Sequence, residues 1–205
     1  MNYIMFAPEY IVFILILMIF GCVLKNDVIL LFCLALSTCL LYFFRGATTI
    51  PNYFNQIDMY CPCDGIVSNI AESDSHVRIS IFLNIHNCHI QYAPFDCLVR
   101  SIQHIPGSFH PAYMLQKSQY NERVVYVLVN EYFGPVIFVQ IAGQLARRIV
   151  SFVKPGEKLT AQEPLGLIKL GSRCDLVIKK GNLIHIQKGS RVRIGDVIMS
   201  RSREL

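Results

Sequence analysis

Several kinds of pattern are missing from this 205-residue chain, and each absence excludes a class of protein. No low-complexity segment and no internal repeat is present, which excludes a repeat or solenoid architecture. No basic patch is interleaved with stacking aromatic residues, so no nucleic-acid partner is predicted. Beyond residue 44 almost no helical periodicity is found, so strands and not helices are expected there.

Cysteine is present but forms no recognisable framework. Three of the eight cysteines lie in the apolar N-terminal region, where cysteine behaves as a small apolar residue. The other five are odd in number and irregularly spaced: Cys61, Cys63, Cys88, Cys97 and Cys174. This pattern does not predict a disulfide scaffold and favours a reducing compartment. The Cys and His residues between positions 61 and 89 also lack the spacing of a common zinc module, so no metal site is predicted.

The apolar residues are concentrated near the N-terminus. The chain is 53% hydrophobic, with a mean hydropathy of +0.42. Residues 10–24 are apolar apart from one glycine, residues 28–44 are apolar apart from Ser37 and Thr38, and a short polar turn separates the two runs. Each run approaches the ~17–25 residues that a transmembrane helix needs. We therefore predict that residues 1–44 form a transmembrane helical hairpin.

A cleaved signal peptide and a re-entrant segment are the alternatives for this region. A signal peptide fits less well, because no basic segment precedes the first run, no small-residue cleavage site is evident and a second apolar run follows at once. Basic residues after the second run predict that the following domain faces the cytoplasm. Beyond residue 44 the chain carries 18 of its 19 Lys and Arg and 12 of its 14 Asp and Glu, a net charge of +6 that suits an anionic membrane surface.

The remainder divides into a polar linker, residues 45–60, and a domain of short strands, residues 61–205. Alternating and β-branched segments predict strands, and turns rich in Gly, Pro and Asn recur between them. The clearest strands are expected at residues 66–70, 77–85, 98–105, 124–131 and 136–142. The predicted fold class is mainly β, a sandwich-like or barrel-like soluble domain that follows the hairpin.

One Gly-Ser pair stands out from the others. Gly107-Ser108 and Gly189-Ser190 have the composition of ordinary turns. At Leu170-Gly171-Ser172, an apolar segment (165–170) leads into the pair and another (174–178) leaves it. The Gly171–Ser172 bond is therefore expected to lie between two strands and not in a long polar loop.

Several short motifs occur in a fixed order around this bond. They are Cys63-Asp64-Gly65, His89, Pro94, Pro106-Gly107-Ser108-Phe109, Asn121-Glu122-Arg123, Gln140-Ile141-Ala142-Gly143, Ala146-Arg147-Arg148-Ile149 and Leu170-Gly171-Ser172. From about residue 43 to about residue 198, this order resembles the phosphatidylserine decarboxylase family in its short, archaeal-like form.

The resemblance implies a proenzyme that cuts itself between Gly171 and Ser172 into a large subunit, 1–171, and a small subunit, 172–205. Ser172 would become a pyruvoyl group, a covalent cofactor that forms a Schiff base with the amine of phosphatidylserine. Withdrawal of electrons into this group would release carbon dioxide and give phosphatidylethanolamine, a lyase reaction. A homodimer is left open.

Asp64 and His89 are the matched positions that the resemblance implies as base and acid. Larger bacterial members carry a second histidine three residues after the first, where this chain has Tyr92, so their Asp-His-Ser relay cannot be transferred whole. His86 is not expected to replace it, because three residues along a regular strand would put it on the opposite face from His89.

Other interpretations stay open beside this one. Asp64 could bond its own backbone in an Asx turn, and His89 could be a strand histidine with its hydrogen bonds satisfied. Asn121-Glu122-Arg123 is interpreted as a source of structural charge pairs. The whole domain could instead be a non-enzymatic, membrane-anchored adaptor similar to lipoyl or biotinyl carriers, although it lacks their lysine hairpin. A degenerate family member that does not mature is the third alternative.

Overall fold

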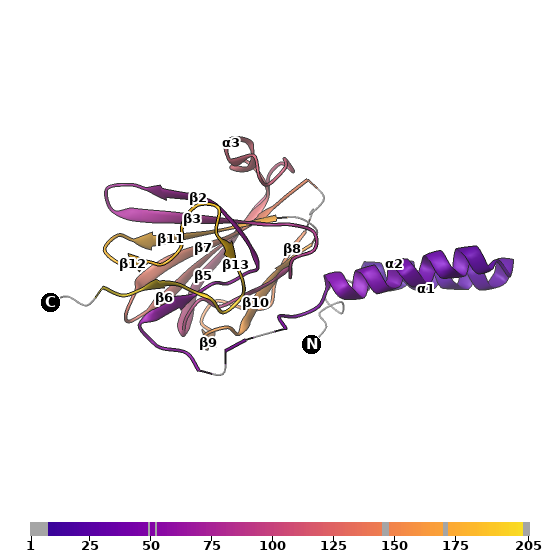
Figure 1. Cartoon of the computed structure of the whole chain (residues 1–205), viewed down its shortest axis with the longest axis horizontal. Helices are drawn as coiled ribbons and strands as arrows, with labels where there is room; N and C mark the ends of the chain where they lie inside the picture. Colours follow the sequence, from indigo (N-terminus) through magenta and orange to yellow (C-terminus); the bar gives the residue numbers. More distant parts are fainter. Residues whose placement is uncertain (1–7, 49, 52, 145–147, 170–171, 203–205) are drawn as a thin grey trace. The chain divides into compact units, whose positions relative to one another are not determined.

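The computed structural model describes residues 8–48, 50–51, 53–144, 148–169 and 172–202. The chain forms two compact units, Met1–Ala47 and Thr48–Leu205 (Figure 1). Two sequence motifs fall partly outside the described residues: Leu170 and Gly171 of the predicted cleavage site, and Ala146-Arg147.

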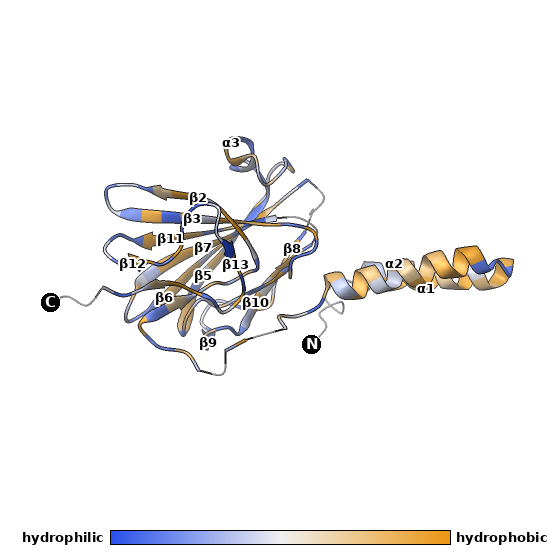
Figure 2. Cartoon of the chain, viewed as in Figure 1, coloured by the Kyte–Doolittle hydropathy of each residue, from blue (hydrophilic) through white to orange (hydrophobic). Residues whose placement is uncertain are grey.

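The first unit is a pair of helices, α1 (Pro8–Leu24) and α2 (Asp27–Phe43), which lie side by side (Figure 1). Asn26 begins α2, because its side-chain oxygen accepts the main-chain N–H groups of Val28 and Ile29 at 3.1 and 3.2 Å. The surface of both helices is mostly apolar (Figure 2). Large side chains stay exposed on it, among them Val23 at 72% and Val28 at 76%.

The structure does not support the predicted membrane crossing. None of the helices in the described part of the chain is both long and apolar enough to span a membrane. α1 and α2 have 17 residues each.

The second unit is built from antiparallel sheets (Figure 1). The eight-stranded sheet has the order β13 (Arg191–Val192), β2 (Gly65–Glu72), β3 (His76–Leu83), β11 (Ser172–Lys179), β7 (Gly134–Ala142), β6 (Arg123–Asn130), β5 (Cys97–Ile105) and β9 (Lys158–Leu159). One three-stranded sheet has the order β1 (Asp58–Tyr60), β14 (Val197–Ser200) and β12 (Leu183–Ile184). The other has the order β4 (Ile90–Tyr92), β10 (Pro164–Ile168) and β8 (Ile149–Ser151). The predicted mainly β class of this unit is confirmed.

One face of the large sheet forms the hydrophobic core. Side chains that alternate along the strands, such as Ile79, Ile81 and Leu83 of β3, are fully buried. Tyr126 of β6 and Phe138 of β7 pack against each other from opposite positions on neighbouring strands, with ring centroids 5.9 Å apart. Burial of each such side chain contributes ~1.5–3 kcal/mol, so this face holds the sheet together.

Strand boundaries differ from the prediction where they matter for the site. The strand expected to continue to residue 85 ends at Leu83, and residues 84–89 form a turn before β4. β10 ends at Ile168, and β11 begins at Ser172 itself. The segment expected to be a loop contains a short helix, α3 (Leu115–Ser118).

A buried ion pair attaches α3 to the sheet. Arg173 of β11 donates to both carboxylate oxygens of Asp175, at 2.9 and 3.2 Å, and both side chains are over 90% buried. The same guanidinium donates to Ser118 Oγ at 2.5 Å and to the Ala112 carbonyl at 3.4 Å. Arg173 therefore fixes the segment that contains α3 against the outer face of β11.

We expect Arg173→Met to lower the free energy of unfolding by ~3–5 kcal/mol, because it leaves the buried Asp175 carboxylate without its partner. The control is Lys180→Met, which removes an exposed ion pair with Glu72 (2.8 Å) and should cost ~1 kcal/mol or less. Urea denaturation followed by circular dichroism measures both losses. Equal losses in the two variants would contradict the structural role of Arg173.

Candidate active site

Ser172 occupies the end of the large sheet. It is the first residue of β11 and pairs with Leu83 of β3 on one side and Ala142 of β7 on the other. Its side chain is fully buried, and its hydroxyl has no hydrogen-bond partner among the described residues. A buried hydroxyl without a partner costs ~1–3 kcal/mol, so its presence calls for a functional explanation.

Asp64 lies in the turn just before β2. One carboxylate oxygen accepts the Ile194 N–H at 2.9 Å, and the other accepts the Cys88 N–H at 3.4 Å. The next residue, Gly65, comes so close to β3 that a Cβ there would lie 2.4 Å from the Phe82 carbonyl oxygen. The Asp64-Gly65 pair thus joins three segments, β2, the 84–89 turn and the segment after β13. Its carboxylate bonds to distant backbone, which makes it more than a local Asx turn.

His89 lies at the end of the 84–89 turn and is fully buried. Its Nδ1 is 2.9 Å from the Asn87 carbonyl oxygen, which can only accept, so Nδ1 carries the proton and Nε2 is the basic nitrogen of the neutral ring. The His89 carbonyl accepts the Ile168 N–H at 3.1 Å. His89 is therefore fixed to the last residue of β10, the strand that leads towards Gly171–Ser172.

A chain of buried amides supports His89 from inside the core. Tyr126 donates its hydroxyl proton to Gln140 Oε1 at 2.7 Å, Gln140 Nε2 donates to Gln91 Oε1 at 2.5 Å, and Gln91 Nε2 donates to the His89 carbonyl at 2.7 Å. Burial raises the pKa of Tyr126, so this phenol stays protonated and can donate. Gly166 of β10 leaves the space for Gln140, because a Cβ there would be 2.8 Å from Gln140 Nε2.

Sequence reasoning found no role for this amide chain. Gln140 belongs to one of the ordered motifs. Its contact with Gln91 could not be recognised from the sequence, because it depends on the pairing of β10 with β4 and on the packing of β7. The only signal was a glutamine inside an otherwise apolar strand, which must find a partner when buried.

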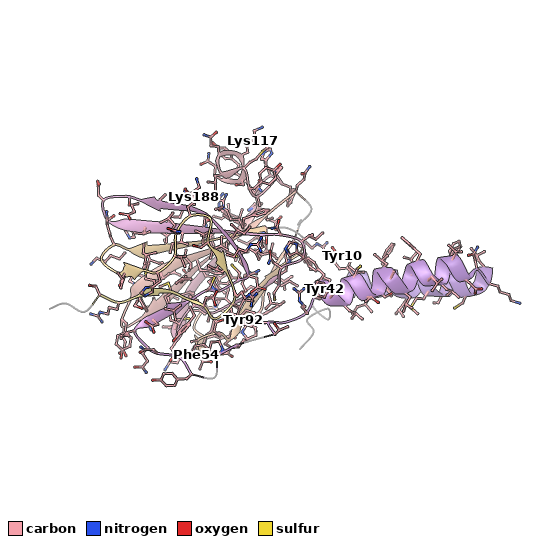
Figure 3. The ribbon with its side chains drawn as sticks, in the orientation of Figure 1. Tyr10, Tyr42, Phe54, Tyr92, Lys117 and Lys188 are labelled. Atoms are coloured by element: carbon pink, nitrogen blue, oxygen red, sulfur yellow. The ribbon has the colours of Figure 1, made fainter. Side chains whose placement is uncertain are left out.

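His86 and Tyr92 have different surroundings. The sequence prediction that His86 lies on a regular strand, facing away from His89, is wrong, because residues 84–89 form a turn. His86 lines a cavity that Asp64 also lines. Tyr92 is buried at the end of β4, inside the β unit (Figure 3), and its main-chain N–H donates to the Pro62 carbonyl at 2.9 Å.

The remaining sequence candidates have structural surroundings. Glu122 Oε1 lies 3.1 Å from His104 Nε2, a contact of the structural kind expected for the Asn121-Glu122-Arg123 motif. Asn121 is buried and donates to the carbonyl of Ala142, the residue paired with Ser172, at 2.7 Å. Burial raises the pKa of the Cys61 and Cys63 thiols well above the usual value, so neither supplies a thiolate at neutral pH. Within the described ranges, no group of three or more Cys, His, Asp or Glu residues could hold a metal ion.

The chain is similar in sequence to known proteins over most of its length. Residues 36–200 match the phosphatidylserine decarboxylase family. A phosphatidylserine decarboxylase proenzyme of Streptomyces coelicolor is 37% identical over 162 residues, covering 78% of this chain and 72% of that protein. A proenzyme of the same name from Carboxydothermus hydrogenoformans is 38% identical over 169 residues, covering 78% of each protein. A putative archaetidylserine decarboxylase proenzyme of Methanococcoides burtonii is 34% identical over 145 residues, covering 71% of this chain and 67% of that protein.

The matched region covers most of the mainly β unit and places the chain among decarboxylase proenzymes. The chain belongs to the phosphatidylserine decarboxylase family, and the resemblance seen in the sequence is confirmed.

We expect Gln140→Leu to lower the free energy of unfolding by ~2–3 kcal/mol, because the Tyr126 hydroxyl and Gln91 Oε1 both lose the buried hydrogen bonds that Gln140 makes. Tyr126→Phe removes a donor from one end of the chain only and should cost ~1 kcal/mol. Urea denaturation compares the two variants. A Gln140→Leu loss no larger than that of Tyr126→Phe would show that the amides do not act as a connected chain.

Proposed function

We propose that this protein is a pyruvoyl-dependent phosphatidylserine decarboxylase, which matures by cleavage between Gly171 and Ser172. The observation that carries the proposal is the buried Ser172 hydroxyl at the start of β11, which has no hydrogen-bond partner among the described residues. A hydroxyl in this position is available to attack the carbonyl of the residue before it. Membership of the decarboxylase family supports the reaction and the substrate.

The cleavage proceeds in three steps. Ser172 Oγ attacks the Gly171 carbonyl carbon while a base takes its proton, and the peptide C–N bond breaks to give an ester and a free amine. Loss of the proton on Cα and breakage of the Cβ–O bond then release the Gly171 carboxylate. The dehydroalanine that results takes up a proton at Cβ and becomes an imine. Water then adds to the imine carbon, ammonia leaves, and a ketone remains at position 172. This ketone supplies an electron sink for decarboxylation of an amine-bearing substrate.

His89 is proposed as the general base in this site. Its Nε2 is the basic nitrogen, and its backbone is held by β10 and by the amide chain. Asp64 is proposed to hold the 84–89 turn in place and to set the electrostatic environment of His89, because its carboxylate accepts the main-chain N–H of Cys88 in this turn. Tyr92 stands where the larger bacterial members have a second histidine, so either His89 takes over that role or the proton follows a different route.

The apolar helices suggest where the enzyme works. Large aliphatic side chains are exposed along α1 and α2, and the rest of the chain is basic. Burial of these side chains in lipid and attraction of the basic domain to anionic headgroups would together hold the protein at a cytoplasmic membrane surface. A lipid substrate fits this location.

Ser172→Ala is expected to abolish cleavage, because alanine has no nucleophilic oxygen. The unmodified protein should separate into fragments 1–171 and 172–205 on a denaturing gel, with the smaller fragment blocked to Edman degradation, whereas the Ser172→Ala variant should stay whole. Ser108→Ala is the control, because Ser108 follows Gly107 in an exposed turn and should leave cleavage unchanged. Carbon dioxide release from phosphatidylserine by the Ser172→Ala variant would refute the pyruvoyl role, and an unmodified chain that stays whole would favour a degenerate member or an adaptor.

His89→Ala is expected to slow cleavage or turnover by ~10²–10⁴-fold, the usual contribution of a general base. His104→Ala is the control, because the His104 side chain is exposed and its hydrogen bond in the described structure is to the Glu122 carboxylate. Gel densitometry over time measures cleavage, and labelled carbon dioxide measures turnover. Full rates in the His89 variant would remove this residue from the site.

A further inference from the structure

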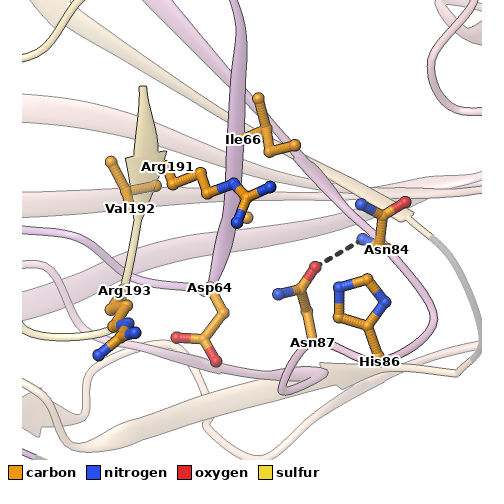
Figure 4. A pocket seen from close by; sticks show the side chains of 9 residues that line it. Asp64, Ile66, Asn84, His86, Asn87, Arg191, Val192 and Arg193 are labelled. Atoms are coloured by element: carbon orange, nitrogen blue, oxygen red, sulfur yellow. Dashed lines mark hydrogen bonds between the residues drawn. The ribbon is translucent and has the colours of Figure 1, made fainter. Parts of the chain in front are cut away.

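A cavity of about 270 Å³ lies where β2 and β13 meet the 84–89 turn (Figure 4). Its polar lining comes from Asp64, Asn84, His86, Asn87, Arg191 and Arg193. Ser172 is not part of this lining. The cavity is therefore a separate feature from the buried serine, and no role in the cleavage steps accounts for its two arginines.

The two guanidinium groups of the cavity are not used by the fold. Neither Arg191 nor Arg193 makes a side-chain hydrogen bond or an ion pair within the described part of the chain. The backbone beneath them is nevertheless fixed, because Arg191 and Val192 pair with β2 and the Arg193 N–H donates to Asp196 Oδ2 at 2.7 Å. The two guanidinium groups are thus carried by a fixed backbone and have no side-chain partner among the described residues.

The single carboxylate in the cavity is already engaged. Both oxygens of Asp64 accept main-chain N–H groups, from Ile194 and from Cys88. Each oxygen of this carboxylate therefore already accepts a hydrogen bond from the main chain. Two arginines against one aspartate leave the lining positively charged even with His86 neutral.

The 84–89 turn adds neutral donors to the cavity. The Asn87 side-chain oxygen accepts the Asn84 main-chain N–H at 2.8 Å (Figure 4), so the Asn87 amide nitrogen is the end left to donate elsewhere. His86 follows on the same turn. Guanidinium and amide donors around a small cavity match a tetrahedral anion with several oxygen atoms, because each oxygen can accept more than one hydrogen bond.

We propose that this cavity binds a phosphate group through Arg191 and Arg193. Gly65 pairs with Val192 of β13 and lies one strand from β3, and Ser172 lies one strand from β3 on the other side. With strands ~4.8 Å apart, the edge of the cavity is about 10 Å from the Ser172 backbone. A lipid headgroup phosphate, which rests on the proposed function, and free phosphate are the two sources of this chemistry.

The binding test uses the full chain with Ser172→Ala, purified in a neutral detergent, so that its result does not depend on maturation. Glycerophosphoserine and inorganic phosphate are titrated separately by calorimetry. We expect Arg191→Ala/Arg193→Ala to weaken binding at least tenfold. Lys179→Ala/Lys188→Ala removes the same charge from exposed positions outside the cavity (Lys188 is labelled in Figure 3) and should change binding less than twofold.

The outcomes separate the two sources. Tighter binding of glycerophosphoserine than of phosphate, lost in the double arginine variant, assigns the cavity to the headgroup. Equal or tighter binding of inorganic phosphate, lost in the same variant, assigns it to free phosphate. No binding of either probe, or equal loss in the arginine and lysine variants, overturns the proposal.

Two further measurements guard against misfolding and test the headgroup source. Arg191→Lys/Arg193→Lys keeps the charge and should restore part of the binding, and thermal unfolding by circular dichroism checks that every variant is folded. With the cleaved enzyme and phosphatidylserine in mixed micelles, headgroup binding predicts a KM about tenfold higher in the double alanine variant with kcat changed less than threefold. A lower kcat with unchanged KM would overturn the headgroup assignment. Failure of the unmodified chain to cleave would count against the proposed function, but it would not affect the binding result.

Discussion

Pairing of β11 on both sides at its first residue is the constraint on which the site depends. Ser172 is hydrogen-bonded into the sheet between Leu83 and Ala142, so its backbone cannot move away from the sheet end. Sheet formation then buries a hydroxyl without giving it a partner among the described residues. The sheet therefore determines both the position of the serine and the burial of its unpaired hydroxyl.

Hydrogen bonds between distant segments hold the residues of the proposed site. Asp64 connects β2 with the His89 turn, and the amide chain through Gln140 reaches the His89 backbone from the core. Asn121 binds the carbonyl of Ala142, the residue opposite the serine. Because each contact joins segments far apart in the chain, the site forms only when the large sheet and the β4–β10–β8 sheet are both in place.

The sequence predicted the parts of this protein that local patterns encode. The β6–β7 hairpin follows from alternation on both sides of Gly134-Pro135, and the ordered motifs identified the family without any knowledge of pairing. The end of β3 was misplaced, because the apolar Ile85 continues the pattern although it is 56% exposed in a turn. The amide chain and the arginine cavity depend on which strands become neighbours, information that no local pattern contains.

The position of β11 has a consequence for the matured protein. A break ahead of Ser172 would leave β11 between β3 and β7, and would leave β14 beside β1 and β13 beside β2. The short C-terminal piece would thus remain interleaved with the long one through four strand pairings and the Arg173 anchor. Such pieces make an obligate noncovalent heterodimer, in which neither polypeptide has a complete core of its own and only global unfolding separates them.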